Sequence, residues 1–429
     1  MRAALALALT LLAPAAFAQT EADGNDDPAP IDPGTLPPRG HWERVGRPRG
    51  TLRRICDLRS FAGGLYLAQA QTPLGSDGAR VFRYEPSPTA PFRLAFDWNR
   101  PGEPARGGGG GQGFLRVRAL DGRLAVPDAD PPYGGLGAID PGTEGYVFLS
   151  DRQGVFAPPR MPGHRLPPQA DLTRDRAGIA VIPRAYHVLD VIRWRGQWIA
   201  STGSVAPRSR AWVGPSPGAL HVSDTSPTRW TYALGYPASA LGNTWRMTYL
   251  VRFGGRLYAG LQDYLGRDPN DFVVIDPPGP SAPIRDAIVR PMQVTPGGGA
   301  YTLRWVADRG RLWWLTLERD GRGHLRFTDD GSRWQELALP PGVGAPTDLV
   351  RWRDGLVLLS VGGLFRLDGT TLRPMAAAPT VPARVRGRRV VASHFGVDDV
   401  FCAAPLAVYQ GHLYAGSQRD GSLWRLVEE

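Results

Sequence analysis

The sequence predicts an all-β protein built from seven copies of one four-stranded unit, and three observations support this fold class. A hairpin pattern, in which two apolar runs flank a glycine-containing turn, recurs from residue 51 onward. Gly and Pro, with 54 and 42 copies in 429 residues, are nearly twice as frequent as in average proteins, which suits many turns. Hydrophobic residues make up 42% of the chain and include 13 Trp, 13 Tyr and 14 Phe, enough for a large core.

The recurring hairpin has the same order of parts in each copy: an apolar strand, a tight turn, and a strand that opens with Leu-Tyr-Ala or a similar run. Such a pattern is typical of a β-hairpin. The seven copies span 59–68, 118–126, 192–201, 250–260, 305–315, 349–360 and 406–416. Their expected turn glycines are Gly64, Gly122, Gly196, Gly255, Gly310, Gly355 and Gly411.

Most copies continue with a third and a fourth strand. Third strands are expected at 81–87, 146–152, 219–225, 324–330 and 364–370, and fourth strands at 92–98, 229–235 and 333–339. Four antiparallel strands repeated at this spacing describe the blades of a β-propeller, whose sheets bury their faces against neighbouring sheets. We expect seven blades, since six or eight would require one miscounted unit.

The two ends of the chain are expected to close the ring. The seventh unit stops at its third strand (422–429), while residues 40–48 resemble 331–340, a fourth strand, in their Gly, Trp and apolar spacing. The N-terminal strand should therefore complete the last blade and cover an otherwise exposed edge. Cys56 and Cys402 lie on the first strands of units one and seven, so we expect a disulfide across the seam; two buried free thiols are the alternative.

The N-terminus reads as an export signal. Residues 1–18 combine Arg2, an apolar run and a small-residue cleavage site near Ala18, which indicates a signal peptide rather than a buried helix. Residues 19–40 are acidic and Pro-rich and are expected to be a disordered spacer, so 41–429 form a single propeller domain. No later stretch is apolar enough for an integral membrane segment. We therefore expect an extracytoplasmic monomer, periplasmic or secreted, and no nucleic-acid partner.

The basic residues are all arginine, because the chain has no lysine among its 50 Lys and Arg positions. This excludes Walker-type phosphate loops, protein kinases, pyridoxal-phosphate enzymes and Schiff-base aldolases, which need a lysine amine. The net charge of +10 favours an anionic partner, although an arginine bias can also reflect a GC-rich genome.

The segment 327–334, FTDDGSRW, resembles the Asp-box (S-x-D-x-G-x-T-W) of sialidases and other BNR-repeat propellers. Asp329, Gly331 and Trp334 match that motif, while Phe327 and Arg333 depart from it. The resemblance implies a structural role, in which the Asp caps a turn and the Trp packs between strands. It implies no activity, and the Arg-Ile-Pro motif of sialidases is absent.

One position on the first strands, about six residues before the turn glycine, collects polar side chains at the expected channel mouth. Arg binds carboxylates bidentately, and Asp, Tyr and His can serve in acid/base chemistry, so this set would suit an anionic sugar. Pairing among these groups across the channel is the structural alternative. With two neighbours, the ligand-binding candidates are Asp57, Arg116, His187, Asp190, Tyr249, Arg246, Arg304 and Asp348.

Other polar segments carry weaker signals. Residues 106–113 are expected to be a glycine-rich connector. A basic cluster in the link before unit seven is expected to be an exposed loop, with polyanion binding as the alternative; it comprises Arg384, Arg386, Arg388 and Arg389. The seven histidines show no zinc-site spacing, so neither metal nor cofactor is expected.

These features predict an exported binding module for a partner protein or an anionic glycan on the channel-mouth face. A glycan-active enzyme on the same face, either a sialidase-like hydrolase or a polysaccharide lyase, is the alternative, with catalytic residues that the sequence does not assign. A third possibility is an assembly scaffold that uses its loops.

Overall fold

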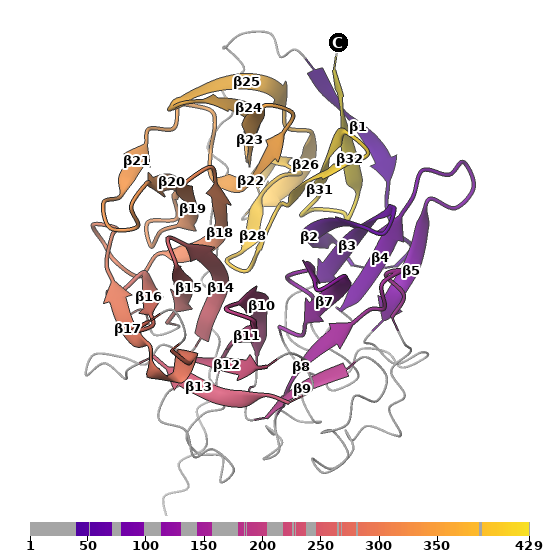
Figure 1. Cartoon of the computed structure of the whole chain (residues 1–429). Helices are drawn as coiled ribbons and strands as arrows, with labels where there is room; N and C mark the ends of the chain where they lie inside the picture. Colours follow the sequence, from indigo (N-terminus) through magenta and orange to yellow (C-terminus); the bar gives the residue numbers. More distant parts are fainter. Residues whose placement is uncertain are drawn as a thin grey trace, which may run out of the picture.

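Seven four-stranded antiparallel sheets form a closed ring in the computed structural model of the chain (Figure 1). The structure describes residues 40–428 except 51, 71–78, 98–112, 130–143, 157–178, 184, 186, 204–217, 225–226, 228, 237–245, 264–265, 267, 280–281 and 386–387. The expected signal peptide, nearly all of the expected spacer and most of the glycine-rich connector lie outside these residues. Among the described residues, no helix has the length and apolarity needed to span a membrane.

In blades one to six, each blade is a meander whose strands follow chain order from the centre outward. Blade one contains β2 (Arg54–Phe61), β3 (Gly64–Ala70), β4 (Arg80–Tyr84) and β5 (Phe92–Asp97). Blade two contains β6 (Arg118–Leu120), β7 (Arg123–Pro127), β8 (Glu144–Leu149) and β9 (Ile179–Pro183). Blade three contains β10 (Val188–Trp194), β11 (Gln197–Thr202), β12 (Ala219–Ser223) and β13 (Thr231–Gly235).

The next three blades repeat this order. Blade four contains β14 (Arg246–Phe253), β15 (Arg256–Gln262), β16 (Phe272–Asp276) and β17 (Ile288–Met292), with the short 3-10 helix η2 (Ile284–Asp286) between the last two. Blade five contains β18 (Tyr301–Asp308), β19 (Arg311–Leu317), β20 (Gly323–Thr328) and β21 (Gln335–Leu337). Blade six contains β22 (Pro346–Trp352), β23 (Gly355–Ser360), β24 (Gly363–Asp368) and β25 (Thr371–Ala377).

Blade seven confirms the predicted ring closure, because strands from both ends of the chain build it. Its inner strands are β30 (Leu406–Tyr409), β31 (His412–Gly416) and β32 (Leu423–Glu428), and its outer strand is β1 (Gly40–Gly46). β1 pairs antiparallel with β32, and Trp42 lies opposite Leu426. The Trp42 ring packs edge-on against Phe395, 5.0 Å between centroids, so the closing strand also contributes to the core.

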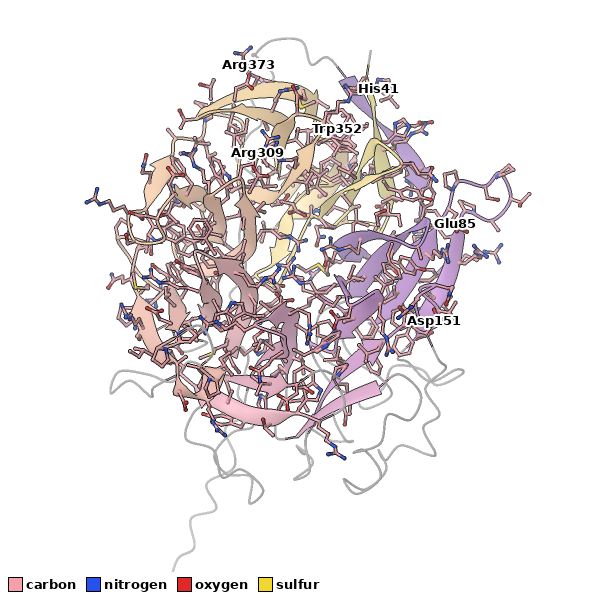
Figure 2. All side chains as sticks on the ribbon, in the orientation of Figure 1. His41, Glu85, Asp151, Arg309, Trp352 and Arg373 are labelled. Carbon is pink, nitrogen blue, oxygen red and sulfur yellow. A yellow bond between two sulfur atoms is a disulfide. The ribbon has the colours of Figure 1, made fainter. Side chains whose placement is uncertain are left out.

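The core is divided among the seven interfaces between neighbouring blades, which Figure 2 shows filled with side chains. Between blades four and five, Trp305 and Trp314 stack with centroids 5.4 Å apart, and Trp334 and Phe272 pack against them. Each sheet thus buries both faces against its neighbours, as the propeller prediction requires.

The inner hairpin turns correct the predicted turn positions in two blades. The two turn residues of blade one are Ala62 (φ 44°) and Gly63 (φ 76°), so Gly64 instead begins β3. In blade six the turn occupies Arg353 (φ 53°) and the following Asp354, and Gly355 begins β23. A tight hairpin turn of this kind favours positive φ, which Gly adopts without strain; here Ala62 and Arg353 adopt it as well.

The link between blades six and seven departs from the exposed loop that we predicted. It forms a separate two-stranded hairpin of β26 (Thr380–Val385) and β27 (Arg388–Ser393), followed by β28 (Val397–Asp399) and β29 (Cys402–Ala403). Three members of the predicted basic cluster, Arg384, Arg388 and Arg389, therefore lie on the strands of a β-hairpin, and Arg386 lies outside the described residues. Hereafter, residues 380–393 are called the arginine hairpin and residues 394–405 the cover segment.

The predicted disulfide is confirmed: Cys56 and Cys402 are bonded, with Cα atoms 4.7 Å apart and a sequence separation of 346. Cys56 lies on the inner strand β2 as expected. Cys402 lies on β29, ahead of the inner strand β30 on which we placed it. The bond therefore ties the cover segment, rather than blade seven itself, to blade one.

Candidate functional site

The predicted polar row maps onto one structurally equivalent position in the inner strands. Counted from the second turn residue of each hairpin, every member lies six positions upstream, and the two shifted turns remove the apparent misalignment of Asp57 and Asp348. Pro405 occupies the seventh position. In blades one, three, five and six the pairing register shifts beside this position, at a β-bulge that turns the side chain out of the ladder.

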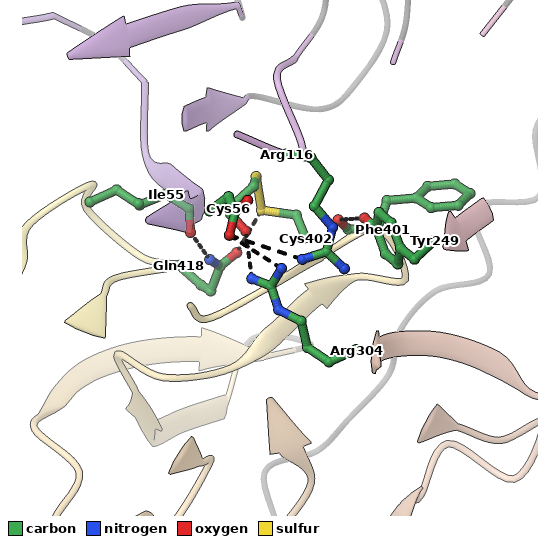
Figure 3. Close-up of a disulfide and its surroundings, with 9 residues drawn as sticks. Ile55, Cys56, Arg116, Tyr249, Arg304, Phe401, Cys402 and Gln418 are labelled. Atoms are coloured by element: carbon green, nitrogen blue, oxygen red, sulfur yellow. Dashed lines mark hydrogen bonds and ion pairs between the residues drawn. A yellow bond between two sulfur atoms is a disulfide. The ribbon is translucent and has the colours of Figure 1, made fainter. Parts of the chain in front are cut away.

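The cover segment lies over this row at the channel mouth, and all eight candidate residues are 0–7% exposed. Tyr249 donates its hydroxyl proton to the backbone carbonyl of Phe401, and the Arg246 guanidinium lies 5.1 Å from the centre of the Phe401 ring. Cys402 is bonded to Cys56 alongside (Figure 3). In the described part of the chain, the row thus faces protein rather than solvent.

The three aspartates link neighbouring blades. The Asp57 carboxylate accepts the N–H of Val117 (2.8 Å), at the start of blade two. The Asp190 carboxylate accepts the N–H of Leu250 in blade four (2.9 Å). The Asp348 carboxylate accepts the N–H of Leu406 in blade seven (2.8 Å). Each aspartate therefore satisfies a backbone donor on the inner strand of the next blade, where the β-ladder offers no partner.

Arg304 joins two of these aspartates. Its Nη1 lies 3.2 Å from Asp57 Oδ1, and its Nε lies 3.3 Å from Asp348 Oδ1. It also donates from Nη2 to the backbone carbonyl of Cys56 (3.2 Å), which anchors blade five to the disulfide (Figure 3). Burial raises the pKa of the Asp348 carboxyl, and the charge of Arg304 and two backbone N–H groups oppose that rise.

Arg116 and Tyr249 form a second contact across the channel. The Arg116 guanidinium lies 3.6 Å from the centre of the Tyr249 ring, a close cation–π contact. Its Nη2 donates to the carbonyl of Leu303 (3.2 Å), while Asp57 is 4.0 Å away. An acid/base role for Tyr249 would need its hydroxyl, which already donates to Phe401.

His187 and Arg246 also meet, as expected for two neighbours of the row. His187 Nδ1 lies 2.6 Å from the carbonyl oxygen of Ala129, so this nitrogen carries the proton. Its Nε2 then accepts from Arg246 Nη2 at 2.9 Å. The imidazole in this arrangement is neutral and serves as an acceptor for the guanidinium.

Arg118 is a member of the cluster that the sequence analysis missed. Its Nε donates to Asp190 Oδ1 (2.8 Å) while its Nη2 bonds the other carboxylate oxygen, a bidentate pair. Burial alone would lower the pKa of Arg118, but the Asp190 carboxylate raises it above the ordinary value. Strand alternation was the available signal, because Arg118 lies two residues after Arg116 and so shares its face.

The Asp-box-like turn of blade five has the expected tryptophan but a different capping residue. Trp334 packs in the interface between blades four and five. The carboxylate that accepts the backbone N–H groups of Ser332 and Arg333, both at 2.8 Å, belongs to Asp330. Asp329 instead pairs with Arg311 (2.6 Å). Gly331 fits the turn because it has φ 76° and because a Cβ there would meet the Tyr258 hydroxyl at 2.1 Å.

One cluster in blade five has metal-ligand residue types. Glu318, Asp320 and His324 offer atoms within 4.8 Å of one another. Glu318 already pairs with Arg326 at 2.5 Å, and His324 Nδ1 lies 2.7 Å from Glu336. A guanidinium beside the first carboxylate opposes a second cation, so these contacts describe a surface ion-pair network.

The arrangement at the channel mouth does two things chemically. It neutralises buried charge by pairing Arg with Asp, and it closes backbone hydrogen bonds between blades. Outside the row, Arg389 of the arginine hairpin is exposed and forms no ion pair with any described residue.

No protein-family model matches the chain, and no curated protein sequence matches it either. Solved structures that resemble it include the extracellular domain of the putative one component system BT4673 from B. thetaiotaomicron, at 11% identity and a TM-score of 0.49 over 89% of this chain. This chain covers 39% of that domain. The WD40 domain of Neurospora crassa Pan2 (8% identity, TM-score 0.47) and BamB from Moraxella catarrhalis (11% identity, TM-score 0.41) align over 92% and 90% of this chain and 97% of their own. At such values the likeness concerns the fold alone.

Proposed function

We propose that this protein is an extracytoplasmic binding module for an anionic glycan, and that the arginine hairpin on the channel-mouth face makes the contact. The observation that supports the proposal is the hairpin's charge. It carries four arginines and no carboxylate within residues 380–393, and Arg384 pairs directly with Arg389 across the two strands. Like charges in directly opposite positions destabilise a hairpin, and an anion between them relieves that cost.

Arg384, Arg388 and Arg389 lie on the two strands of this hairpin. The hairpin belongs to no blade, and the His394 N–H closes its base by donating to the carbonyl of Pro379 at 2.9 Å. Arg419, between the last two strands of blade seven, donates from Nε to the Ser393 carbonyl at 3.3 Å, and Ala392 is buried. Beyond that base, Pro382, Arg389 and Val391 are exposed, the last to 62%. Arg guanidinium groups bind sulfate and carboxylate groups through paired N–H donors, so a sulfated or uronic-acid polymer fits this surface.

An extracytoplasmic location is part of the proposal. The bonded Cys56–Cys402 pair supports it, since disulfides persist in oxidising compartments. The Asp-box-like turn of blade five supports kinship with the BNR-repeat propellers through the spacing of Asp329, Gly331 and Trp334, although Asp330 rather than Asp329 caps the turn. Export by cleavage near Ala18 and a monomeric state complete the proposal.

The test is a binding titration with dextran sulfate and alginate, with neutral dextran as the blank. Replacing Arg384, Arg386, Arg388 and Arg389 by Gln should weaken binding at least tenfold. The matched control replaces four arginines whose side chains are 55–81% exposed, Arg285, Arg290, Arg322 and Arg373, and so removes the same charge. Figure 2 labels Arg373, on blade six. Equal losses in both variants would refute a hairpin site, because they would show that only net charge matters.

The competing partner is an acidic protein, and poly-glutamate added to the same titration represents it. Binding of poly-glutamate without binding of dextran sulfate or alginate would contradict the glycan assignment and favour a protein partner. Tight binding of the sulfated or uronic-acid polymer, weakened by salt, would support it.

A further inference from the structure

The inner strands carry more positive than negative charge inside the ring. The polar row and the equivalent positions two residues farther along the same strands together hold four arginines and three aspartates. The arginines are Arg59, Arg116, Arg118 and Arg304, and the aspartates are Asp57, Asp190 and Asp348. The remaining members of the second row are Ile192, Val251, Val306, Val350 and Ala407, so they offer no charge.

The three aspartates are already committed to other donors. Asp57 accepts from Arg304 and the Val117 N–H. Asp190 accepts from Arg118 and from the N–H groups of Leu250 and Val191. Asp348 lies against Arg304 and accepts from the N–H groups of Leu406 and Leu349. The carboxylates of these three aspartates are therefore engaged by three of the four guanidiniums and by backbone N–H groups.

Arg59 is the guanidinium that remains. It is partly buried on β2, and in the described part of the chain it donates one long hydrogen bond, from Nε to the Val117 carbonyl (3.4 Å), and makes no ion pair. Burial lowers the pKa of Arg59; the charges of Arg118 and Arg304 add to that effect, and Asp57 and Asp348 oppose it. A guanidinium in such surroundings is stabilised by any anion that reaches it.

Arg59 and Arg118 lie at equivalent positions of adjacent blades, on the side of the row away from the cover segment. Each is four residues before the second turn residue of its hairpin, and the Arg118 side chain keeps 24% exposure despite its bond to Asp190. The cover segment closes the opposite mouth. A ligand would therefore approach from the mouth at which the inner hairpin turns lie.

We propose that Arg59 and Arg118 form a binding site for a small oxyanion, a sulfate, phosphate or carboxylate group, within the ring. Arg59 supplies unused N–H donors and uncompensated charge, and Arg118 supplies the Nη1 group that its bidentate contact with Asp190 leaves over. The partly buried Val251, Val306 and Val350 occupy the equivalent positions of three other blades and would offer apolar contacts to a carboxylate ligand. This site is independent of the arginine hairpin.

The test measures Tm at constant ionic strength while sulfate, phosphate or acetate replaces chloride at low millimolar concentration. Saturation at a hundredfold excess over Kd should raise Tm by about 3 °C. Arg59→Met should abolish that response and should unfold at a higher temperature than the parent in anion-poor buffer, since it removes an uncompensated charge. Arg252→Met is the control: Arg252 is an exposed arginine on the inner strand β14, and its loss should leave the response intact.

A crystal soaked in selenate provides a second, direct readout that does not depend on variant folding. An anomalous peak between Arg59 and Arg118 would support the site. The anion that raises Tm most in the series then shows whether the site prefers a tetrahedral oxyanion, as in sulfate and phosphate, or a carboxylate, as in acetate. A full sulfate response in Arg59→Met, or no anion response in the parent together with no selenate peak there, would overturn the proposal. Loss of dextran sulfate binding in the hairpin variant would not affect either outcome.

Discussion

Removing the Cys56–Cys402 disulfide should cost a large, measurable part of the stability of the ring. The bond closes a loop of 346 residues, and the chain-entropy relation for a loop of that length gives about 6 kcal/mol at 25 °C. With an unfolding entropy of about 2.1 cal/mol/K per residue over roughly 390 residues, that free energy corresponds to about 7 °C in Tm.

The assay is calorimetric or circular-dichroism melting of the parent and of the Cys56→Ala/Cys402→Ala double variant. Both sulfurs are buried, so reductant must be added during a slow melt, after which the parent should approach the Tm of the double variant. The double variant itself should not respond to reductant. If the parent melts at the same temperature with and without the Cys56–Cys402 bond, the reasoning that this bond lowers the conformational entropy of the unfolded chain is refuted.

Three further variants test the packing and pairing of the ring by thermal melting. Asp190→Asn should destabilise the protein by about 3 kcal/mol, since it leaves Arg118 without its buried carboxylate. The control is Asp329→Asn, which removes the carboxylate of an exposed ion pair and should leave Tm unchanged; equal effects would contradict the assignment of a buried pair. Trp42→Ala should cost about 3–5 kcal/mol by emptying the interface with Phe395, and a loss below 1 kcal/mol would show that β1 does not close the ring. Burial would raise the pKa of Asp420, but hydrogen bonds from His394, Ser422 and Ser417 hold it well below its ordinary value of 3.8. As pH falls below about 4, the unfolded chain therefore takes up this proton before the folded protein does, and the stabilisation is lost. Asp420→Asn should flatten the decline of Tm between pH 5 and 3, and an unchanged decline would contradict this assignment.

The fold could be predicted because the inner hairpin repeats with a recognisable pattern. Two apolar strands and a tight turn are specified locally, and seven copies fix the architecture. No fourth strand was predicted for blades two, four and six. In blade four the physical reason is that β17 carries Pro291 and lies on the outer edge, where ladder hydrogen bonds and apolar alternation are not required. The turns of blades one and six were displaced by one residue because a Gly begins the strand after the turn in both blades: Gly64 follows Gly63 in blade one, and Gly355 follows Asp354 in blade six.

The candidate site was predicted in part. Alignment of the first strands identified the residues that meet at the channel mouth, because equivalent positions of a propeller face the same axis. Their partners were not predictable, since Arg304 reaches Asp57 over 247 positions of sequence and the cover segment folds back from blade six. Arg59 and Arg118 were within reach of the pattern, because both lie two residues beyond a row member, on the same strand face.

Hydrogen–deuterium exchange with and without dextran sulfate tests the central claim most directly, namely that the arginine hairpin binds the ligand while the buried row holds the blades together. Protection should increase across residues 380–393 and stay unchanged at the row, in 54–58, 188–191 and 346–349. New protection at the row with an unaffected hairpin would contradict the claim and would place ligand binding beneath the cover segment.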